Sequence, residues 1–258
     1  MNTRIAILGR GRMGREIQSC LAESDELQLA GIWTRSRTPE DSRSETPESD
    51  NLAFVLSTAD VAVDFTLPAV SDQIIDAVTI AKVPLVCGVS GLTDSSLQHM
   101  AEAATRIAIL YDRNMSLGVA VLRKLVHLAG AALGDRFEAE IHETHHVHKI
   151  DAPSGTALQL GETLAASRGQ NFAEVYHYEK DGQRTPSEGD IHFEVTRRDE
   201  VPGEHTVLLR SANESLALTH KVADRRVFAV GALEAARWLV TQAPGLYSLQ
   251  DLLVDAPG

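Results

Sequence analysis

Short apolar runs alternate with amphipathic helical patterns through the first part of this chain. The runs that predict strands lie at residues 5–8, 27–33, 61–65, 84–89 and 107–111. Helical patterns lie between them at residues 14–23, 69–82 and 93–105. Neighbouring parallel strands need a crossover connection, usually a helix, so this alternation is typical of a parallel sheet covered on both faces. It predicts an α/β domain with a doubly wound parallel sheet over residues 1–115.

The pattern changes beyond about residue 115. A helix, a strand and a second helix are followed by β-like runs with turns between them: 117–133, 137–142, 154–167, 175–179, 190–195, 205–212 and 215–222. Strands that follow one another directly favour a mixed or antiparallel sheet, which predicts an α+β domain with a mixed sheet at residues 116–225. The helical pattern at 228–240 is expected to return, so that segment 226–258 completes the first domain.

Residues 36–50, SRTPEDSRSETPESD, interrupt the alternation. The segment is rich in serine, proline and acid and cannot bury much apolar area, so we expect a mobile surface loop without chemistry.

Charge limits the possible partners. The chain carries 24 basic and 36 acidic residues, a net charge of −12, which repels phosphate backbones and anionic lipid. We expect no nucleic-acid partner and no membrane partner, since no apolar window reaches the length that spans a bilayer and the N-terminal apolar run stops at Gly9. Only Cys20 and Cys87 are present, which fits a reducing, cytoplasmic location.

A glycine-rich turn follows the first predicted strand directly. Residues 9–14 read GRGRMG, which is G-x-G-x-x-G at the start of the first helix. Glycine lets the backbone approach a pyrophosphate, and the N–H groups at a helix N-terminus receive its charge. Within a βαβ unit this motif predicts a Rossmann-type dinucleotide site.

The end of the second strand bears on the choice of dinucleotide. An acid there usually binds the ribose 2′-hydroxyl of NAD, but this strand ends in Trp33-Thr34-Arg35-Ser36-Arg37, with two cations and no carboxylate. This favours NADPH, with NADH also expected to be accepted.

Four histidines, His142, His145, His146 and His148, lie within seven residues. They suggest zinc, but in an extended strand His142 and His145 point to opposite faces, and no second ligand cluster follows. We therefore expect no metal. Imidazole exchanges protons near neutral pH, which fits this segment better, and Lys149 adds a cation.

The segment after the histidines, Asp151-Ala152-Pro153-Ser154-Gly155-Thr156, predicts a helix start. Proline stiffens the entry, serine can cap the helix, and glycine lets a ligand approach the backbone. The stretch therefore offers proton donors beside a cradle for a carboxylate.

Residues 143–157 resemble the motif E-x-HH-x-x-K-x-D-x-PSGTA of the 4-hydroxy-tetrahydrodipicolinate (dihydrodipicolinate) reductase family of the diaminopimelate route to lysine. The segments GRMG (11–14), DFT (64–66), GEHT (203–206) and THK (219–221) also match, so the similarity covers nearly the whole chain. The resemblance implies an NAD(P)H-dependent oxidoreductase that reduces a cyclic dicarboxylate to tetrahydrodipicolinate. It also implies a homotetramer built through the second domain's sheet.

Roles for residues follow from the resemblance. His145 is the expected proton donor and acceptor, and Lys149 the second proton donor. The expected substrate-binding residues are His146, Ser154, Gly155 and Thr156. The expected cofactor-binding residues are Gly9, Arg10, Gly11, Arg12, Met13, Gly14, Arg35, Gly88, Val89, Ser90, Asp112, Arg113, Asn114 and Met115. Glu143 and Asp151 could orient these groups, but we assign neither a direct role.

Some positions depart from the family pattern and leave other functions open. The glycine loop is one residue shorter, Thr34 stands where an acid is common, Val89 replaces a hydroxyl residue, and Met115 replaces an aromatic ring. The alternatives are a zinc-dependent hydrolase, an NADP-sensing protein without activity, and a related oxidoreductase acting on another imine or aldehyde. Stoichiometric metal in a chelator-washed sample would support the hydrolase.

Replacing Arg35 with alanine should weaken NADPH binding more than NADH binding, because a guanidinium pairs with the 2′-phosphate that NADH lacks. Titration of both proteins with both nucleotides tests this. Equal losses would reject a contact between Arg35 and the phosphate.

Overall fold

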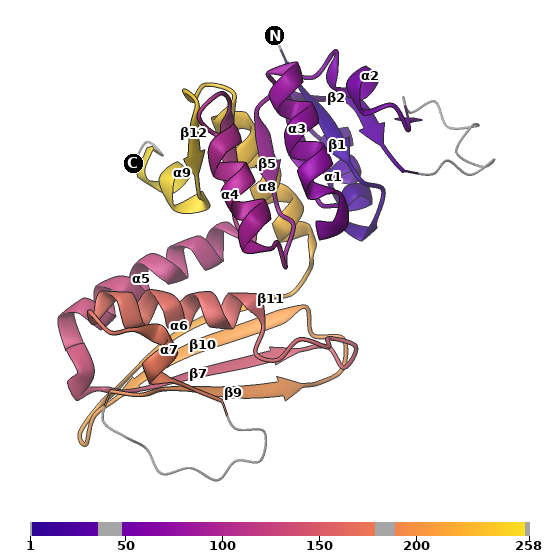
Figure 1. Cartoon of the computed structure of the whole chain (residues 1–258). Coiled ribbons are helices and arrows are strands. Elements are labelled where there is room, and N and C mark those ends of the chain that lie inside the picture. The colour runs from indigo at the N-terminus through magenta and orange to yellow at the C-terminus, as the bar shows by residue number, and fades with distance from the viewer. Residues whose placement is uncertain (1, 36–47, 179–188, 256–258) are drawn as a thin grey trace. The chain divides into compact units, whose positions relative to one another are not determined.

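The computed structural model describes residues 2–35, 48–178 and 189–255. The chain folds into two compact units (Figure 1). The first contains the chain up to Leu117 together with the segment from Arg226 onward, and the second contains Gly118–Arg225. The fold of each unit is described by itself.

The first unit is built on a seven-stranded parallel sheet in the order β12-β6-β5-β4-β1-β2-β3. Its strands are β1 (Thr3–Leu8), β2 (Leu27–Trp33), β3 (Glu48–Ser49), β4 (Val61–Asp64), β5 (Leu85–Cys87), β6 (Ala108–Tyr111) and β12 (Gly245–Tyr247). The prediction of a doubly wound parallel sheet is confirmed. The short strands β3 and β12 were not predicted.

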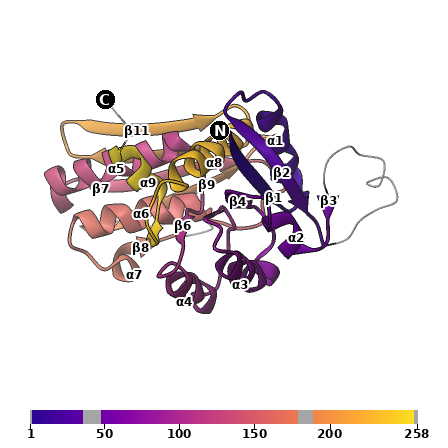
Figure 2. The same ribbon diagram turned by 90° about the horizontal axis from the view of Figure 1, so that it is seen from above.

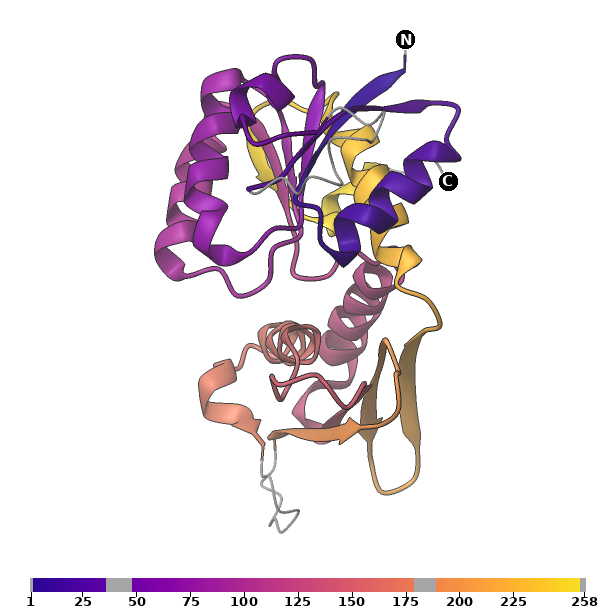
Figure 3. The same ribbon diagram turned by 90° about the vertical axis from the view of Figure 1, so that its right-hand side faces the viewer.

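Helices cover both faces of this sheet. Figure 3 shows α1 (Arg12–Ala22) and α8 (Arg226–Leu239) on one side, and α3 (Ser71–Ala81) and α4 (Asp94–Ala103) on the other. Figure 2 shows α3 and α4 side by side. The remaining helical segments are α2 (Leu52–Leu56), the 3₁₀ turn η2 (Pro68–Val70) and α9 (Leu249–Asp255). Cover on both sides explains why strands such as β4 are apolar and buried at nearly every position.

The strand order changes direction beside β1. From β1 the chain continues outward to β2 and β3, then crosses to β4 on the other side of β1. In such sheets ligands bind at the carboxyl ends of the strands where the order reverses. The glycine-rich turn after β1 lies at this point.

The second unit has a mixed five-stranded sheet in the order β11-β10-β7-β9-β8, as predicted. Its strands are β7 (Glu138–His145), β8 (Tyr176–His177), β9 (Ile191–Arg197), β10 (Gly203–Arg210) and β11 (Ser215–Val222). The central strand β7 pairs in parallel with β9 and antiparallel with β10. The helices α5 (Leu117–Leu133) and α6 (Gly155–Ser167) cover one face of the sheet (Figure 3). The short η3 (Gly134–Arg136) and α7 (Phe172–Val175) complete the described elements.

Strand β7 alternates strictly between buried residues and residues that are exposed or partly exposed. Ala139 and Ile141 belong to the core against α5 and α6, together with Val207 and Phe193 from the flanking strands. Glu143 and His145 continue the same buried face toward the end of the strand. Because side chains alternate with a period of two, the core face of β7 continues directly into the polar side chains of Glu143 and His145.

Residues 36–47 of the expected surface loop lie outside the described residues. The end of that segment is not a loop, because Glu48 and Ser49 form β3 beside β2 and the indole of Trp33 donates to the carbonyl of Asp50 (3.0 Å). Strand β7 extends to His145, three residues beyond its predicted end.

Leu117–Arg136 is, among the described residues, the one helix long and apolar enough by length and composition to cross a membrane, so the expectation that no window reaches this length is wrong. Arg123 and Lys124 interrupt this apolar stretch, and Leu122 and Val126 are buried in the core of the second unit. One side of the helix therefore packs as a core helix.

Both cysteine side chains are buried in the first unit. Cys20 lies on α1 and Cys87 at the end of β5, and neither forms a disulfide. Burial raises the pKa of the Cys87 thiol, and the nearby Asp64 carboxylate raises it further.

Candidate active site

The histidine segment spans the end of β7 and a tight turn. His145 is the last strand residue, and its carbonyl accepts a hydrogen bond from the backbone N–H of Arg198 (2.8 Å). The chain then reverses, with the N–H of Lys149 donating to the carbonyl of His146 (3.1 Å). The alternation of an extended strand therefore applies to His142 and His145 but not to the residues after them.

The four clustered histidines do not converge on one point. His142 lies on the sheet face opposite His145 and contacts Glu140 (2.8 Å) and Glu194 (3.6 Å). His148 is exposed beside Glu200 (3.3 Å), and His146 is partly exposed. The segment alone does not form a zinc site.

A different cluster forms around His145. Nδ1 of His145 lies 3.2 Å from Oε2 of Glu143, and Nε2 of His205, on β10, lies 3.9 Å from the same oxygen. The two imidazole rings meet edge to face, with centroids 5.0 Å apart. All three side chains are buried, and their donor atoms lie within 4.8 Å of one another. Two histidines and a glutamate also form the ligand set of some catalytic zinc sites.

Arg197 is the fourth member of this cluster. Its Nη1 and Nη2 both donate to Oε1 of Glu143 at 3.2 Å. It lies on β9 directly beside His145, because the parallel register pairs these two residues. The guanidinium therefore supplies the charge that a buried carboxylate requires.

The charges of the cluster follow from these contacts. Burial raises the pKa of Glu143, but the close approach of His145, the hydrogen bond from Ser154 and the charge of Arg197 outweigh burial and lower the pKa to about 2. Burial, with a smaller contribution from His145, lowers the pKa of His205 to about 3. At neutral pH the site therefore holds a carboxylate beside a neutral His205.

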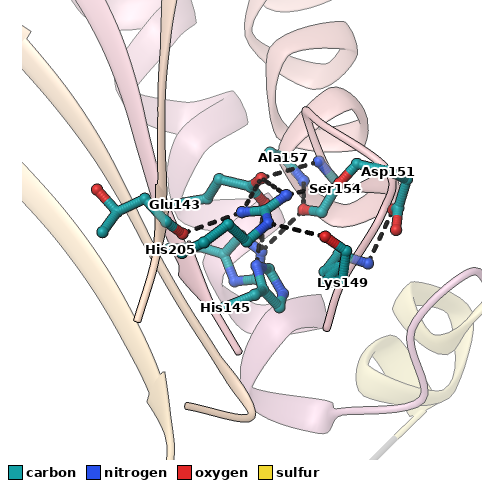
Figure 4. Close-up of polar contacts among 9 residues, drawn as sticks. Glu143, His145, Lys149, Asp151, Ser154, Ala157 and His205 are labelled. Atoms are coloured by element: carbon teal, nitrogen blue, oxygen red, sulfur yellow. Dashed lines mark hydrogen bonds and ion pairs between the residues drawn. The ribbon is translucent and has the colours of Figure 1, made fainter. Parts of the chain in front are cut away.

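The start of α6 is attached to the same carboxylate. The backbone N–H of Ser154 donates to Oε1 of Glu143 (3.1 Å), and its Oγ accepts from the N–H of Ala157 (3.2 Å), which confirms the predicted cap. The same Oγ lies 3.3 Å from Nε2 of His205. Figure 4 shows Glu143, His145 and His205 facing Ser154 and Ala157 at the helix start. Gly155 and Thr156 form the first turn of α6.

Lys149 lies beside this cluster in the loop between β7 and α6. Its Nζ pairs with Asp151 (2.8 Å), and the lysine side chain is 22% exposed, so a ligand can reach it. Nε of Arg197 donates to the carbonyl of Lys149 (3.3 Å), and Nη2 donates to that of Asp151 (2.5 Å). The loop is thus tied to the cluster through one guanidinium.

Sequence reasoning missed three residues here. Arg197 and His205 lie more than fifty residues from Glu143 in the chain. Burial lowers the pKa of His146, and Arg225 lies close enough for its charge to lower that pKa further. His205 lies within the matching segment GEHT, which could have pointed to it. No comparable signal marks Arg197.

The first unit contains the predicted dinucleotide turn. Gly9 has φ +96°, and a Cβ on Gly14 would lie 2.1 Å from the Gly9 carbonyl oxygen, so the turn closes only with glycine at these positions. Gly11 is the N-cap of α1 and supplies no capping side chain. Arg12 and Met13 follow in the first turn of α1. The turn fits a pyrophosphate, because it is compact and leads into a helix N-terminus without a competing cap.

Arg10 and Arg35, the arginines near the ends of β1 and β2, have different surroundings. Arg10 pairs with the buried Glu48 of β3 (3.1 Å). Arg35 is exposed beyond the end of β2, and Arg37 lies outside the described residues. The carboxylate of Glu48, on the strand next to β2, is thus already paired with Arg10.

The remaining predicted cofactor residues lie just after β5 and β6. The N–H of Gly88 donates to the carbonyl of Asp64 (2.9 Å), and that of Asp112 to the carbonyl of Cys87 (3.3 Å), so these strand ends adjoin. Among the others, Ser90 and Arg113 are exposed, Asn114 is partly exposed, and Val89 and Met115 are buried. Burial raises the pKa of Asp64, in the matching segment DFT, to about 6.

Family models match the sequences of both units. The family model "Dihydrodipicolinate reductase, N-terminus" matches residues 3–115, and "Dihydrodipicolinate reductase, C-terminus" matches residues 118–253.

Similar proteins cover the full length of the chain. The 4-hydroxy-tetrahydrodipicolinate reductase of Caulobacter vibrioides is 41% identical over 254 residues, covering 97% of this chain and 96% of its own. That of Alkalilimnicola ehrlichii is 37% identical over 265 residues, covering 98% and 99%. Among solved structures, dipicolinate-bound dihydrodipicolinate reductase from Paenisporosarcina sp. TG-14 has a TM-score of 0.79 at 24% identity, covering 97% of this chain and 99% of that one.

The lowered pKa of His205 predicts a pH dependence of stability. Between the ordinary value of 6.5 and about 3, the unfolded chain binds a proton that folded His205 does not, so stability falls as the pH falls. Between pH 6.5 and pH 5 the loss should be roughly 1.5 kcal/mol, because the slope approaches 1.36 kcal/mol per pH unit only as the unfolded histidine becomes fully protonated.

Urea unfolding of wild type and His205→Gln across this interval tests the prediction. The glutamine variant should lose less stability by about that amount. The interval lies above 4.5, the ordinary pKa of Glu143, so that carboxylate contributes little to the difference. Parallel pH dependences of the two proteins would contradict it.

Proposed function

This chain belongs to the dihydrodipicolinate reductase family, and from that premise we propose that His145 and Lys149 supply the protons for its reaction. The activity is that of a 4-hydroxy-tetrahydrodipicolinate reductase, an oxidoreductase of lysine biosynthesis. The observation that supports the proposal best is the joint attachment of His145, the Lys149 loop and the start of α6 to one buried carboxylate and its arginine.

The first unit binds NAD(P)H. When bound, the reduced nicotinamide supplies a hydride. We assign the pyrophosphate to the N-terminus of α1, with Gly9, Gly11 and Gly14 allowing its approach. We propose a preference for NADPH, since Thr34 offers no carboxylate to the ribose, Glu48 is buried against Arg10, and Arg35 is exposed at the end of β2.

The substrate is a small dicarboxylate resembling dipicolinate. Its negative charge fits a site with Lys149, the charge of Arg225 near His146, and the N-terminus of α6. We assign His146, Gly155 and Thr156 to its carboxylates. Ser154 already gives its N–H to Glu143 and its Oγ to Ala157, so its contribution is to hold the first turn of α6 in place.

Reduction of a double bond by a hydride also requires a proton as negative charge develops on the substrate. An imidazole and an ammonium group are the two donors held near the α6 start. We assign this proton to the pair, with His145 as proton donor and acceptor and Lys149 as the second donor of the site. A biosynthetic reaction that draws on NAD(P)H also leads us to propose a cytoplasmic location.

Replacing His145 or Lys149 with alanine should lower turnover by about a hundredfold or more, because each change removes a proton donor, while the dinucleotide should still bind. NADPH oxidation is followed with the condensation product of pyruvate and aspartate semialdehyde. Unchanged turnover in both variants would remove the assigned roles.

We also propose a homotetramer assembled through the sheet of the second unit. Seven of the eight residues of the edge strand β11 are exposed or partly exposed, and α5 also exposes Val121, Leu125 and Leu128. An edge strand with this much exposed surface offers a site for pairing with another chain.

Light scattering should give a mass about four times the 28.0 kDa of one chain. A variant with Leu216→Lys on β11 should have a lower mass, because a buried charge without a partner disfavours association. A monomeric wild type at micromolar concentration would contradict the proposal.

A further inference from the structure

Glu143 has no part in the proton transfers assigned above, yet it is the most completely enclosed charge of the cluster. The residue is 2% exposed. Its Oε1 accepts from the N–H of Ser154 and from both terminal nitrogens of Arg197. Its Oε2 faces Nδ1 of His145 and Nε2 of His205. A carboxylate in such surroundings requires an explanation, because burying a charge is costly unless it is paired.

Arg197 connects this carboxylate with the neighbouring loop. One guanidinium contacts Glu143, the carbonyl of Lys149 and the carbonyl of Asp151. The planar group fixes several acceptors at once, which a flexible ammonium does less well. The backbone that carries Lys149 is thereby tied to the group beneath His145.

The approach of Glu143 also determines how the ring of His145 presents its two nitrogens. Glu143 is ionised at neutral pH, since its pKa is lowered to about 2. An ionised carboxylate only accepts hydrogen bonds, so the nitrogen 3.2 Å from it, Nδ1, carries a proton. The two atoms are not aligned as a full hydrogen bond, and such contacts commonly tighten in the reacting complex.

The other nitrogen, Nε2, is then the one that can exchange a proton with substrate. It lies beside Gly203, where a Cβ would be 3.2 Å away. Glycine at residue 203 leaves room on that side of the ring. The geometry therefore separates a nitrogen held by the protein from a nitrogen left for chemistry.

We propose that Glu143 and Arg197 are a positioning pair, which holds His145 with Nε2 toward the reaction and fixes the Lys149 loop beside it. The inference rests on the proposed function and deepens it. Neither residue is assigned contact with substrate or nicotinamide. Their effect on the reaction passes through the two proton donors.

A metal ion bound by Glu143, His145 and His205 is the competing explanation for the cluster. The ligand set is suitable for zinc. Oε1 of the carboxylate is, however, already bound by a guanidinium and a backbone N–H, and this positive charge would oppose a dication on the same group. The surroundings favour the positioning pair.

The test compares Glu143→Gln and Arg197→Lys, alone and combined, with Glu26→Gln as the matched control. Glu26 also pairs with an arginine, Arg237 (3.1 Å), but lies exposed in the first unit. For each protein we measure kcat, KM for substrate, the Kd for NADPH, the solvent deuterium isotope effect on kcat and the melting temperature.

Glu143→Gln should lower kcat by roughly ten- to a hundredfold, as loss of a group that orients a functional histidine does elsewhere. The isotope effect should rise, because proton transfer becomes slower, while the Kd for NADPH should stay within about twofold of wild type. Arg197→Lys should lower kcat by less than about tenfold and raise KM, because one of several loop contacts is retained. A merely structural role would not change the isotope effect. The control should match wild type.

The combined variant tests whether the two residues act as one unit. Its loss in kcat should be smaller than the product of the two single losses. Independent, multiplying losses would overturn the pairing. Should Glu143→Gln fail to fold, Arg197→Lys carries the test, and wild-type kcat, KM and isotope effect in that variant would overturn the proposal.

Two further outcomes separate this inference from the proposed function. If His145→Ala and Lys149→Ala retain wild-type turnover, the proton donors themselves are wrongly assigned. If those variants are inactive while Glu143→Gln is fully active with an unchanged isotope effect, only the positioning pair is wrong. Stoichiometric zinc in chelator-washed wild type that is absent from Glu143→Gln would also overturn it in favour of a metal site.

Discussion

The register of β7 is the constraint on which the site of the second unit depends. Ala139 and Ile141 bury one face of the strand against the helices, and the period of two then places Glu143 and His145 on the same face. If the register of β7 slipped by one residue, both the apolar pair and the polar pair would turn to the opposite face of the sheet. The packing that stabilises the core therefore also fixes the position of Glu143 and His145. The pairing of β7 with β9 places Arg197 beside His145, and its pairing with β10 places His205 beside Glu143. Chemistry and stability are therefore inseparable along this strand.

In the proposed assignments both units present a helix N-terminus to an anion, but by different means. In the first unit Gly11 caps α1 without a side chain, and the close contact between Gly9 and Gly14 leaves the backbone of the turn open to approach. In the second unit Ser154 caps α6 and is itself held by Glu143. A pyrophosphate needs access to backbone, whereas a small carboxylate needs a fixed position beside proton donors. The two caps match these two requirements.

Periodicity and local motifs predicted much of this molecule. The alternation of strands and helices gave the parallel sheet, and the segment from Glu143 to Ala157 indicated proton donors and a capped helix. The short strands β3 and β12 were not predicted, because two or three residues carry no periodic signal. Glu48 lies in a polar segment that the sequence assigned to a loop. Arg197 could not be found because its role depends on a pairing between strands some fifty residues apart. Local chemistry is readable from sequence, whereas contacts between distant strands require the sheet itself.

The two cysteines offer a practical consequence. Both thiols are enclosed by the first unit, at 7% and 1% exposure for Cys20 and Cys87, and the thiolate that reacts with common labels is suppressed at Cys87. A cysteine introduced at an exposed position would therefore react with a maleimide far faster than either native residue. One such site in each unit would accept a pair of fluorophores or spin labels without first removing the native thiols. Spectroscopic distances between the labels would then test whether nucleotide or dicarboxylate changes the spacing of the units.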